Sequence, residues 1–269
     1  FYQYHPYDVV WGPMYWGHSK TNDFIKWEQL PIALAPEASY DMGGCFSGSA
    51  LESDGKHVIM YTGVLDNKDE NGERIVRQTQ CIAIGNGENY EKLDCNPVIT
   101  HEMLPEGSSL EDFRDPKIWI EGEEFYCVVA SRSNDGSGQI LMYKSNNLKE
   151  WEFVAIVDNS KNKVGRMWEC PDLFSLNGKD VLIISPQEVK ATKDGFHNGN
   201  NTAYLIEKYD NEKNSFERES CNVIDFGLDF YAPQTLESTD GRRIMIGWMQ
   251  SWENRIVPAN FKWCGMMTI

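Results

Sequence analysis

The sequence predicts an all-β protein, and the prediction rests on short apolar strands, polar turns and an internal repeat. Seven segments of six to nine residues are rich in Val, Ile, Tyr and Met, as β-strands are: 57–63, 80–85, 124–131, 139–145, 180–185, 202–210 and 242–249. Turn sequences rich in Gly, Asn and Asp bound them: 52–56, 121–124, 134–138, 176–180, 210–214 and 238–242. No long stretch has the period of an amphipathic helix.

The repeat predicts how these strands are organised. Four segments begin with a short polar or acidic motif and continue as strand, turn and strand: 45–63, 113–131, 168–186 and 229–249. A fifth unit is partly present at 1–34, and its tail at 19–30 recurs loosely at 144–154, each read as two outer strands joined by a turn. Repeats of about four strands each are the signature of a β-propeller. We therefore expect one five-bladed β-propeller over residues 1–269, with its first blade incomplete at the N-terminus.

In a propeller the first strand of every blade lines the central channel. Four polar residues occupy the starts of the repeated motifs: Ser47, Asp115, Glu169 and Asp229. They are far apart in sequence, but the architecture predicts that they converge on one pocket.

The charge balance limits the partners. The chain has 41 acidic and 25 basic residues, a formal net charge of −16. Long-range repulsion then opposes binding to nucleic acid and to anionic membrane surfaces, although a local basic pocket for a phosphorylated small molecule stays possible. Aromatic residues are plentiful, and their faces suit the C–H faces of sugars as well as β-rich cores. The abundance of aromatic residues is only a hint of a sugar ligand, and the sequence does not indicate an oligomeric state.

The seven cysteines are scattered and never form a C-x-x-C pair, so they form neither a disulfide framework nor a zinc pattern. A reducing compartment, the cytoplasm, is the simpler interpretation. The five histidines have no metal-ligand spacing, and we expect neither metal nor cofactor. No apolar run is long enough to cross a bilayer.

The motif RMWECPDLF at 166–174 places Glu169 between a tryptophan and a cysteine. A carboxyl group among apolar neighbours loses hydration, which favours its protonated form and lets it donate a proton. The alternative is a glutamate at a strand end with its head in water. The motif alone favours the alternative, whereas the repeat favours the proton donor.

At these motifs the chain resembles glycoside hydrolase family 32, the β-fructofuranosidases. The resemblance runs over nearly the whole sequence and rests on the order of several motifs: FYQYHP…WGPMYWGHS (1–19), WEQLPIALAP (27–36), CFSGSA (45–50), FRDPKIW (113–119), MWECPDLF (167–174), DFYAPQT (229–235) and GRRIMIGWM (241–249). The last two are most similar to the sucrose and sucrose-phosphate hydrolase branch. The resemblance implies a retaining hydrolase that removes terminal β-D-fructofuranosyl residues from sucrose, sucrose 6-phosphate or short fructans.

The resemblance also implies roles for individual residues. Glu169 would be the general acid/base, Asp115 would bind two hydroxyls of the fructosyl ring and stabilise the transition state, and Arg114 would hold that carboxylate network and contact substrate. Asp229 matches the acidic position of the fifth blade. Four further residues match positions that line the fructose pocket: Gln3, Trp11, Phe46 and Ser47.

The sequence departs from the family pattern at both ends. Family members carry the nucleophilic aspartate in an N-D-P-N-G-type motif shortly before the segment that matches residues 1–6, and they carry a C-terminal β-sandwich. Neither is in the printed sequence, so we expect a fragment of the catalytic domain that does not by itself form the glycosyl-enzyme intermediate.

Other interpretations stay open at this stage. Asp115 in FRDP can be a strand-start ion pair, Asp229 can link blades by hydrogen bonds, and Trp11 can be a core residue. The polar run 66–74 is expected to be a solvated hairpin tip. Two other functions compete: a non-catalytic sugar-binding propeller, and a related glycosidase acting on arabinose or xylose polymers, against which FSGSA and the FRDP and EC motifs argue.

Overall fold

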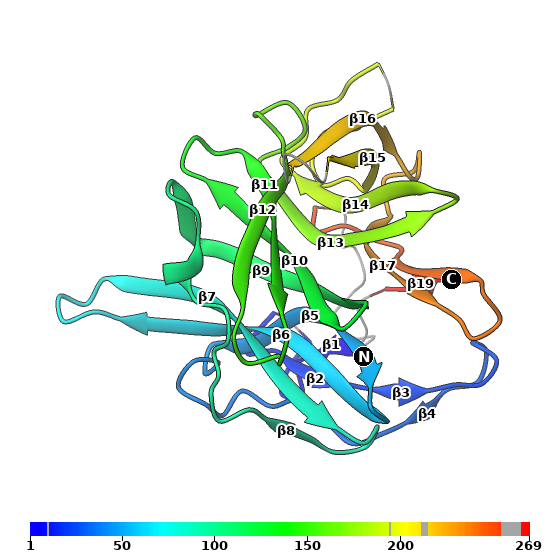
Figure 1. Cartoon of the computed structure of the whole chain (residues 1–269). Coiled ribbons are helices and arrows are strands. Elements are labelled where there is room, and N and C mark those ends of the chain that lie inside the picture. Colours follow the sequence, from blue (N-terminus) through cyan, green and yellow to red (C-terminus); the bar gives the residue numbers. More distant parts are fainter. Residues whose placement is uncertain (10, 194, 211–214, 254–264) are drawn as a thin grey trace. The chain divides into compact units, whose positions relative to one another are not determined.

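The structure is a computed structural model that describes residues 1–9, 11–193, 195–210, 215–253 and 265–269 (Figure 1). The described residues form 19 β-strands and one short 3-10 helix, η1 (His101–Met103), and no α-helix occurs among them. The all-β prediction is confirmed. None of the described helical structure has the length and apolar character needed to cross a membrane.

The chain divides into two compact units. Unit 1 comprises residues 1–106, 110–127 and 144–152, and unit 2 comprises 107–109, 128–143 and 153–269.

Unit 1 begins with two small ribbons and continues with a four-stranded sheet. The ribbons pair β1 (Tyr2–Tyr4) with β2 (Tyr15–Gly17) and β3 (Ser19–Lys20) with β4 (Glu28–Gln29). The sheet is an antiparallel meander of consecutive strands, β5 (Gly44–Ser53), β6 (Lys56–Lys68), β7 (Arg74–Gly85) and β8 (Tyr90–Lys92). The β6–β7 hairpin is longer than its neighbours and extends past the edge of the sheet (Figure 1).

A second four-stranded sheet has the order β12-β11-β10-β9, and its residues are divided between the two units. Its strands are β9 (Ser108–Glu121), β10 (Glu124–Ser133), β11 (Gly138–Ser145) and β12 (Glu152–Asn159).

Unit 2 contains two further meanders. One is four-stranded, with β13 (Met167–Leu176), β14 (Lys179–Gln187), β15 (Ala203–Asp210) and β16 (Ser215–Val223). The other is three-stranded, with β17 (Tyr231–Glu237), β18 (Arg243–Trp248) and β19 (Met267–Thr268).

All seven strands expected from the apolar segments are present, as β6, β7, β10, β11, β14, β15 and β18. The described residues contain four sheets of three or four strands, each of the meander type that builds a propeller blade, and the count of five is not confirmed. The described part of residues 1–34, expected to be an incomplete blade, forms the two ribbons and an isolated bridge between Trp16 and Leu34. The expected turn at 211–214 and Cys264 lie outside the described residues.

The middle strands of the sheets form the cores of the units. In β6 the seven residues from Val58 to Val64 are all buried, because both faces of the strand are covered. In unit 1 buried residues from the ribbons and from three strands pack into one cluster: Trp16, Ala33, Leu34, Cys45, Ile59, Tyr61, Cys81 and Ala83. The sheets are therefore firmly packed behind the strands that carry the predicted site residues.

Candidate functional site

The motif-bearing strands are interrupted where the predicted site residues lie. The pairing register shifts between Phe46 and Gly48 in β5 and between Glu169 and Asp172 in β13. A third shift lies between Tyr231 and Gln234 in β17. Such bulges break the ladder locally and redirect side chains, and they are common beside active sites.

Left-handed backbone accompanies these interruptions. Asp115, Cys170 and Ala232 have φ angles of 63°, 50° and 52°, and each is followed by a proline. Positive φ is uncommon for residues other than glycine and persists only where the surroundings impose it. The repeat found in the sequence is therefore a repeat of a strained strand geometry, and it is this geometry that presents Asp115 and the Glu169–Cys170 pair.

In unit 1, Asp115 is buried, with 7% of its surface exposed. Its backbone N–H donates to the Thr62 hydroxyl at 2.9 Å. The neighbouring Arg114 forms an ion pair with Asp112, with Nη1 3.0 Å from Oδ1, and Nη1 also donates to Gln78 Oε1 at 3.4 Å. The backbone of Asp115 and the side chain of Arg114 are thus held by the protein before any ligand is considered.

The predicted pocket-lining residues gather around β5. Gln3 on β1 donates from Nε2 to the Cys45 carbonyl at 3.3 Å, and its Oε1 is buried without a hydrogen-bond partner among the described residues. The rings of Trp11 and Phe46 meet edge to face, with centroids 5.2 Å apart. Ser47 is half-buried at the β5 bulge.

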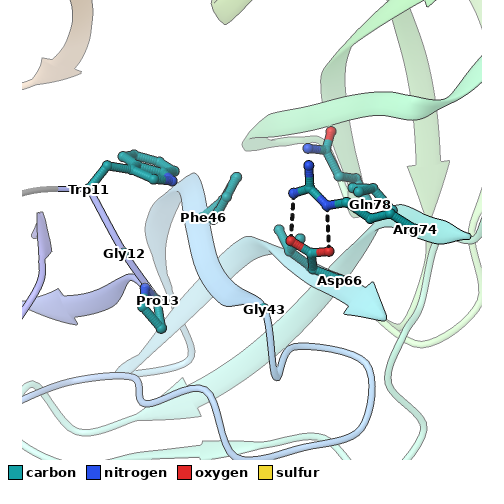
Figure 2. A pocket seen from close by; sticks show the side chains of 10 residues that line it. Trp11, Gly12, Pro13, Gly43, Phe46, Asp66, Arg74 and Gln78 are labelled. Carbon is teal, nitrogen blue, oxygen red and sulfur yellow. Dashed lines mark hydrogen bonds and ion pairs between the residues drawn. The ribbon is translucent and has the colours of Figure 1, made fainter. Parts of the chain in front are cut away.

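A pocket of about 560 Å³ opens beside this aromatic pair. Figure 2 shows Trp11 and Phe46 on one side and the ion pair between Asp66 and Arg74 on the other. Arg74 donates to both carboxylate oxygens of Asp66, Nε to Oδ1 at 2.7 Å and Nη2 to Oδ2 at 2.6 Å, and this holds the pKa of Asp66 below its usual value. A pocket of this size suits a small sugar.

Asp66 and Arg74 were not predicted as site residues. The run 66–74 was interpreted as a solvated hairpin tip, and both of its ends are exposed as that interpretation requires, but they also line the pocket. The extended pairing of β6 with β7 brings its two ends into the pocket wall, at the register Lys68–Arg74 and Asp66–Val76. The signal in the sequence that could have predicted this ion pair was an acidic and a basic residue at the two ends of a hairpin.

In unit 2, Glu169 is half-buried on β13, next to the fully buried Trp168. Its Oε2 accepts two hydrogen bonds, from Gln187 Nε2 at 2.8 Å and from the Tyr231 hydroxyl at 2.7 Å. The Tyr231 hydroxyl also lies 3.2 Å from the Ser185 carbonyl. Two donors that converge on one carboxylate oxygen fix the orientation of the carboxyl group.

Gln187 and Tyr231 also escaped the sequence analysis. Tyr231 lies in the DFYAPQT motif, at the repeat position of Glu169, since both precede a left-handed residue and a proline. Gln187 is the last residue of β14, opposite Met167 in the register. Only the folded sheet makes them neighbours of the acid.

Asp229 corrects one expectation. It was predicted to lie on the first strand of its blade, but it lies two residues before β17 and is exposed. The chain there runs through an exposed loop, and the strand begins only at Tyr231.

The structure thus joins Trp11 to Phe46, Gln3 to β5 and Arg114 to the pocket residue Gln78, all in unit 1. Glu169 and Asp229 belong to unit 2. Among the described residues no group of three or more His, Cys, Asp or Glu side chains could hold a metal ion.

Comparison with known proteins gives the family. The chain is 40% identical to a sucrose-6-phosphate hydrolase of Zymomonas mobilis, and the match covers 100% of this chain and 53% of that protein. It is 35% identical to a raffinose invertase of Escherichia coli, covering 100% of this chain and 55% of that protein. The chain therefore spans about half the length of the curated relatives that it matches.

Solved structures agree in fold. A mutant of a Bombyx mori GH32 beta-fructofuranosidase in complex with sucrose matches with a TM-score of 0.88 at 40% identity, covering 100% of this chain and 56% of that chain. A sucrose-6-phosphate hydrolase from Lactobacillus gasseri matches with a TM-score of 0.84 at 30% identity, covering 99% and 54%. The family model "Glycosyl hydrolases family 32 N-terminal domain" matches residues 1–269. The chain belongs to glycosyl hydrolase family 32.

Proposed function

We propose that this chain supplies the general acid/base and the fructosyl-binding groups of a retaining β-fructofuranosidase that acts on sucrose, sucrose 6-phosphate or short fructans. The observation that carries the proposal is the setting of Glu169, a half-buried carboxyl group at a strand bulge with two donors on one oxygen. The proposal is supported by family membership and by relatives named sucrose-6-phosphate hydrolase and raffinose invertase.

Glu169 is the proposed proton donor to the leaving glycosidic oxygen. Oε2 accepts hydrogen bonds from Gln187 and Tyr231, and these bonds fix the orientation of the carboxyl group. In a retaining mechanism this group gives a proton to the leaving oxygen and, in the second half of the reaction, takes one back from water.

The RD pair and the aromatic residues are the proposed fructosyl site. Asp115 accepts hydrogen bonds from ring hydroxyls, and Arg114, held by Asp112 and Gln78, keeps the charge of this network balanced. Trp11 and Phe46 offer aromatic faces to the C–H faces of the sugar. Gln3 Oε1 is a buried acceptor for a further hydroxyl, and the half-buried Ser47 is a further proposed contact in unit 1. In unit 2 the exposed Asp229 is proposed as a substrate-binding residue.

A retaining mechanism needs a nucleophilic carboxylate about 5–5.5 Å from the acid. The proposal assigns this role to an aspartate outside the printed sequence, in the motif that the family resemblance implies. The two ribbons of residues 1–34 are then parts of a fifth blade. No disulfide joins the described cysteines, which supports a reducing compartment such as the cytoplasm.

The test uses the full-length protein. Glu169→Gln is expected to lower kcat/KM for sucrose by about 10²–10⁴-fold, because the leaving group loses its proton donor. Glu217→Gln, an exposed glutamate on β16, is the matched control and is expected to leave the rate unchanged. Measuring kcat/KM for sucrose, sucrose 6-phosphate and inulin in the same preparation identifies the substrate.

Near-normal turnover by the Glu169→Gln protein would remove Glu169 from the proposed role. A wild-type protein that binds fructose but turns over none of the three substrates would instead favour a sugar-binding function without catalysis.

A further inference from the structure

Two buried polar side chains at the centre of unit 1 have no part in the proposed chemistry. Thr62 on β6 and Gln80 on β7 are both completely buried and lie opposite each other in the register. Burial of a hydroxyl and an amide is unfavourable unless their hydrogen bonds are made. Their partners therefore show what the two side chains hold.

Thr62 and Gln80 bind the backbone on both sides of Arg114. Gln80 Nε2 donates to the Phe113 carbonyl at 2.8 Å, the Thr62 hydroxyl donates to Gln80 Oε1 at 2.9 Å, and the Asp115 N–H donates to Thr62 Oγ1 at 2.9 Å. The hydroxyl thus donates once and accepts once. Together these bonds satisfy two backbone groups of β9 at the point where its backbone turns left-handed.

A second glutamine, Gln78, also forms a hydrogen bond with the backbone of β9. Gln78 lies two residues from Gln80, on the same face of β7, and its Oε1 accepts from the Phe113 N–H at 3.0 Å. The Q-T-Q sequence at 78–80 thereby bonds both the N–H and the carbonyl of Phe113. β9 is fixed up to the residue before the RD pair, and Thr62 completes the arrangement at Asp115.

Unit 2 contains a related bond. Ser185 on β14 is buried, and its hydroxyl accepts from the N–H of the left-handed Ala232 at 3.1 Å. The recurrence indicates that a hydroxyl on a middle strand is this fold's means of holding a left-handed residue on the next motif strand. In unit 1 the residue so held carries a carboxylate.

We propose that Thr62 and Gln80 are positioning residues for Asp115: they impose its left-handed backbone and thereby direct its carboxylate at the fructosyl ring. This inference rests on the proposed role of Asp115. Without the hydroxyl the buried Asp115 N–H loses its acceptor, and one restraint on a φ of 63° that L-residues disfavour is removed. Misplacement of a binding group by about 1 Å can cost on the order of 10²-fold in rate.

The experiment compares Thr62→Val, Thr62→Ser and Thr79→Val in the full-length protein, with kcat/KM for sucrose and Kd for fructose as readouts. Valine keeps the shape of threonine without the hydroxyl, so Thr62→Val is expected to weaken both by about 10- to 100-fold. Serine keeps the hydroxyl and is expected to stay within about threefold of wild type. Thr79, on the same strand as Gln80, is also buried, and its valine variant controls for a lost hydroxyl elsewhere in the hairpin.

A double-mutant cycle separates positioning from general damage. Asp115→Asn combined with Thr62→Val is expected to be no worse than Asp115→Asn alone, because Thr62 acts through Asp115. Additive losses, or a Thr62→Val protein with normal fructose affinity, would overturn the inference. If Thr62→Val does not fold, Gln80→Met removes two bonds of the same set and is read against the same outcomes. If the wild-type protein binds fructose but turns over no substrate, the proposed catalytic function is wrong. The positioning role is still tested in that case, by the Kd for fructose.

Discussion

Glu207 is a buried carboxyl group that the proposed reaction does not use. It lies on β15 with 3% of its surface exposed, close to Asp158 and Arg218. Arg218 is already paired with Asp158, with Nε 2.5 Å from Oδ2. Burial, together with the negative charge of Asp158, raises the pKa of Glu207 to about 9, so this side chain is protonated in the folded protein at neutral pH.

The raised pKa predicts a loss of stability as pH increases. Between the ordinary pKa of 4.5 and the folded value of about 9, the folded state keeps a proton that the unfolded state has released. The free energy of unfolding therefore falls with rising pH in this window, by at most about 1.4 kcal/mol per pH unit. Glutamine has no proton to lose, so Glu207→Gln is expected to unfold at a higher temperature than wild type at pH 8, with the gap narrowing towards pH 5.

Thermal unfolding from pH 5 to 8.5 measures this effect, and Glu217→Gln on the exposed face of β16 provides a control with no pH-dependent gap. A gap that is constant with pH, or that widens towards acid, would mean that Glu207 is ionised in the folded protein.

Some site residues could be predicted from the sequence and others could not. Glu169 and Asp115 could be predicted as site residues because their motifs repeat, and a repeat can be recognised in the sequence itself. Gln187, Tyr231 and Thr62 could not be predicted, because each forms a hydrogen bond with a residue that is distant in sequence and that only the fold brings near. Tyr231 is 62 positions from Glu169 in sequence, and its hydroxyl is 2.7 Å from the carboxylate.

At the scale of elements, one turn is built twice. In 21–27 and 145–151 a hydroxyl accepts from the N–H three residues on, at 2.9 Å from Thr21 to Phe24 and 3.0 Å from Ser145 to Leu148. Phe24 and Leu148 are left-handed, with φ of 59° and 65°. Asp23 and Asn147, two residues after the hydroxyl residues, each accept hydrogen bonds from two further backbone N–H groups. The indole N–H groups of Trp27 and Trp151 donate to the carbonyls of Phe24 and Leu148.

The loose similarity of 19–30 and 144–154 was therefore structural. The two segments share a hydroxyl residue, an Asp or Asn, and a tryptophan. These are the residues whose side chains form hydrogen bonds with the backbone of the turn. The expectation of two strands joined by a turn is confirmed for 19–30 by β3 and β4. The apolar segments likewise located the middle strands, whereas the bulges in β5, β13 and β17 escaped prediction, because they interrupt a strand pairing that only the fold establishes.

Asn147→Ala is expected to lower the free energy of unfolding by about 1 kcal/mol, as the loss of a capping side chain does. Asn147 Oδ1 accepts from the N–H groups of Lys149 and Glu150 at 3.0 and 2.9 Å, and both lose this acceptor. Urea unfolding measures the change, with Asn147→Asp as the conservative partner, since aspartate serves at the matching position 23. An alanine variant as stable as wild type would mean that water replaces these bonds at no cost.

At the scale of the whole chain, composition constrained the class of protein but not its architecture in full. The all-β class followed from strand and turn composition. The number of blades did not, because residues 1–34 form two ribbons in place of a full sheet. Asp229 shows the same limit: a motif fixes the order of residues, but where a strand begins depends on what pairs with it.

The net charge gives a prediction about substrate choice. A formal charge of −16 repels a phosphate monoester, which carries nearly two negative charges near pH 7. Among the described residues that line the pocket beside Trp11 and Phe46, the charged ones are Asp66 and Arg74, and their ion pair neutralises the positive charge. Salt shortens the range of repulsion from about 30 Å at 0.01 M to about 8 Å at 0.15 M. In the full-length enzyme, kcat/KM for sucrose 6-phosphate is therefore expected to rise several-fold over this range, while that for uncharged sucrose stays constant. A fall with added salt would instead reveal a local basic site whose attraction for the phosphate exceeds the repulsion of the chain.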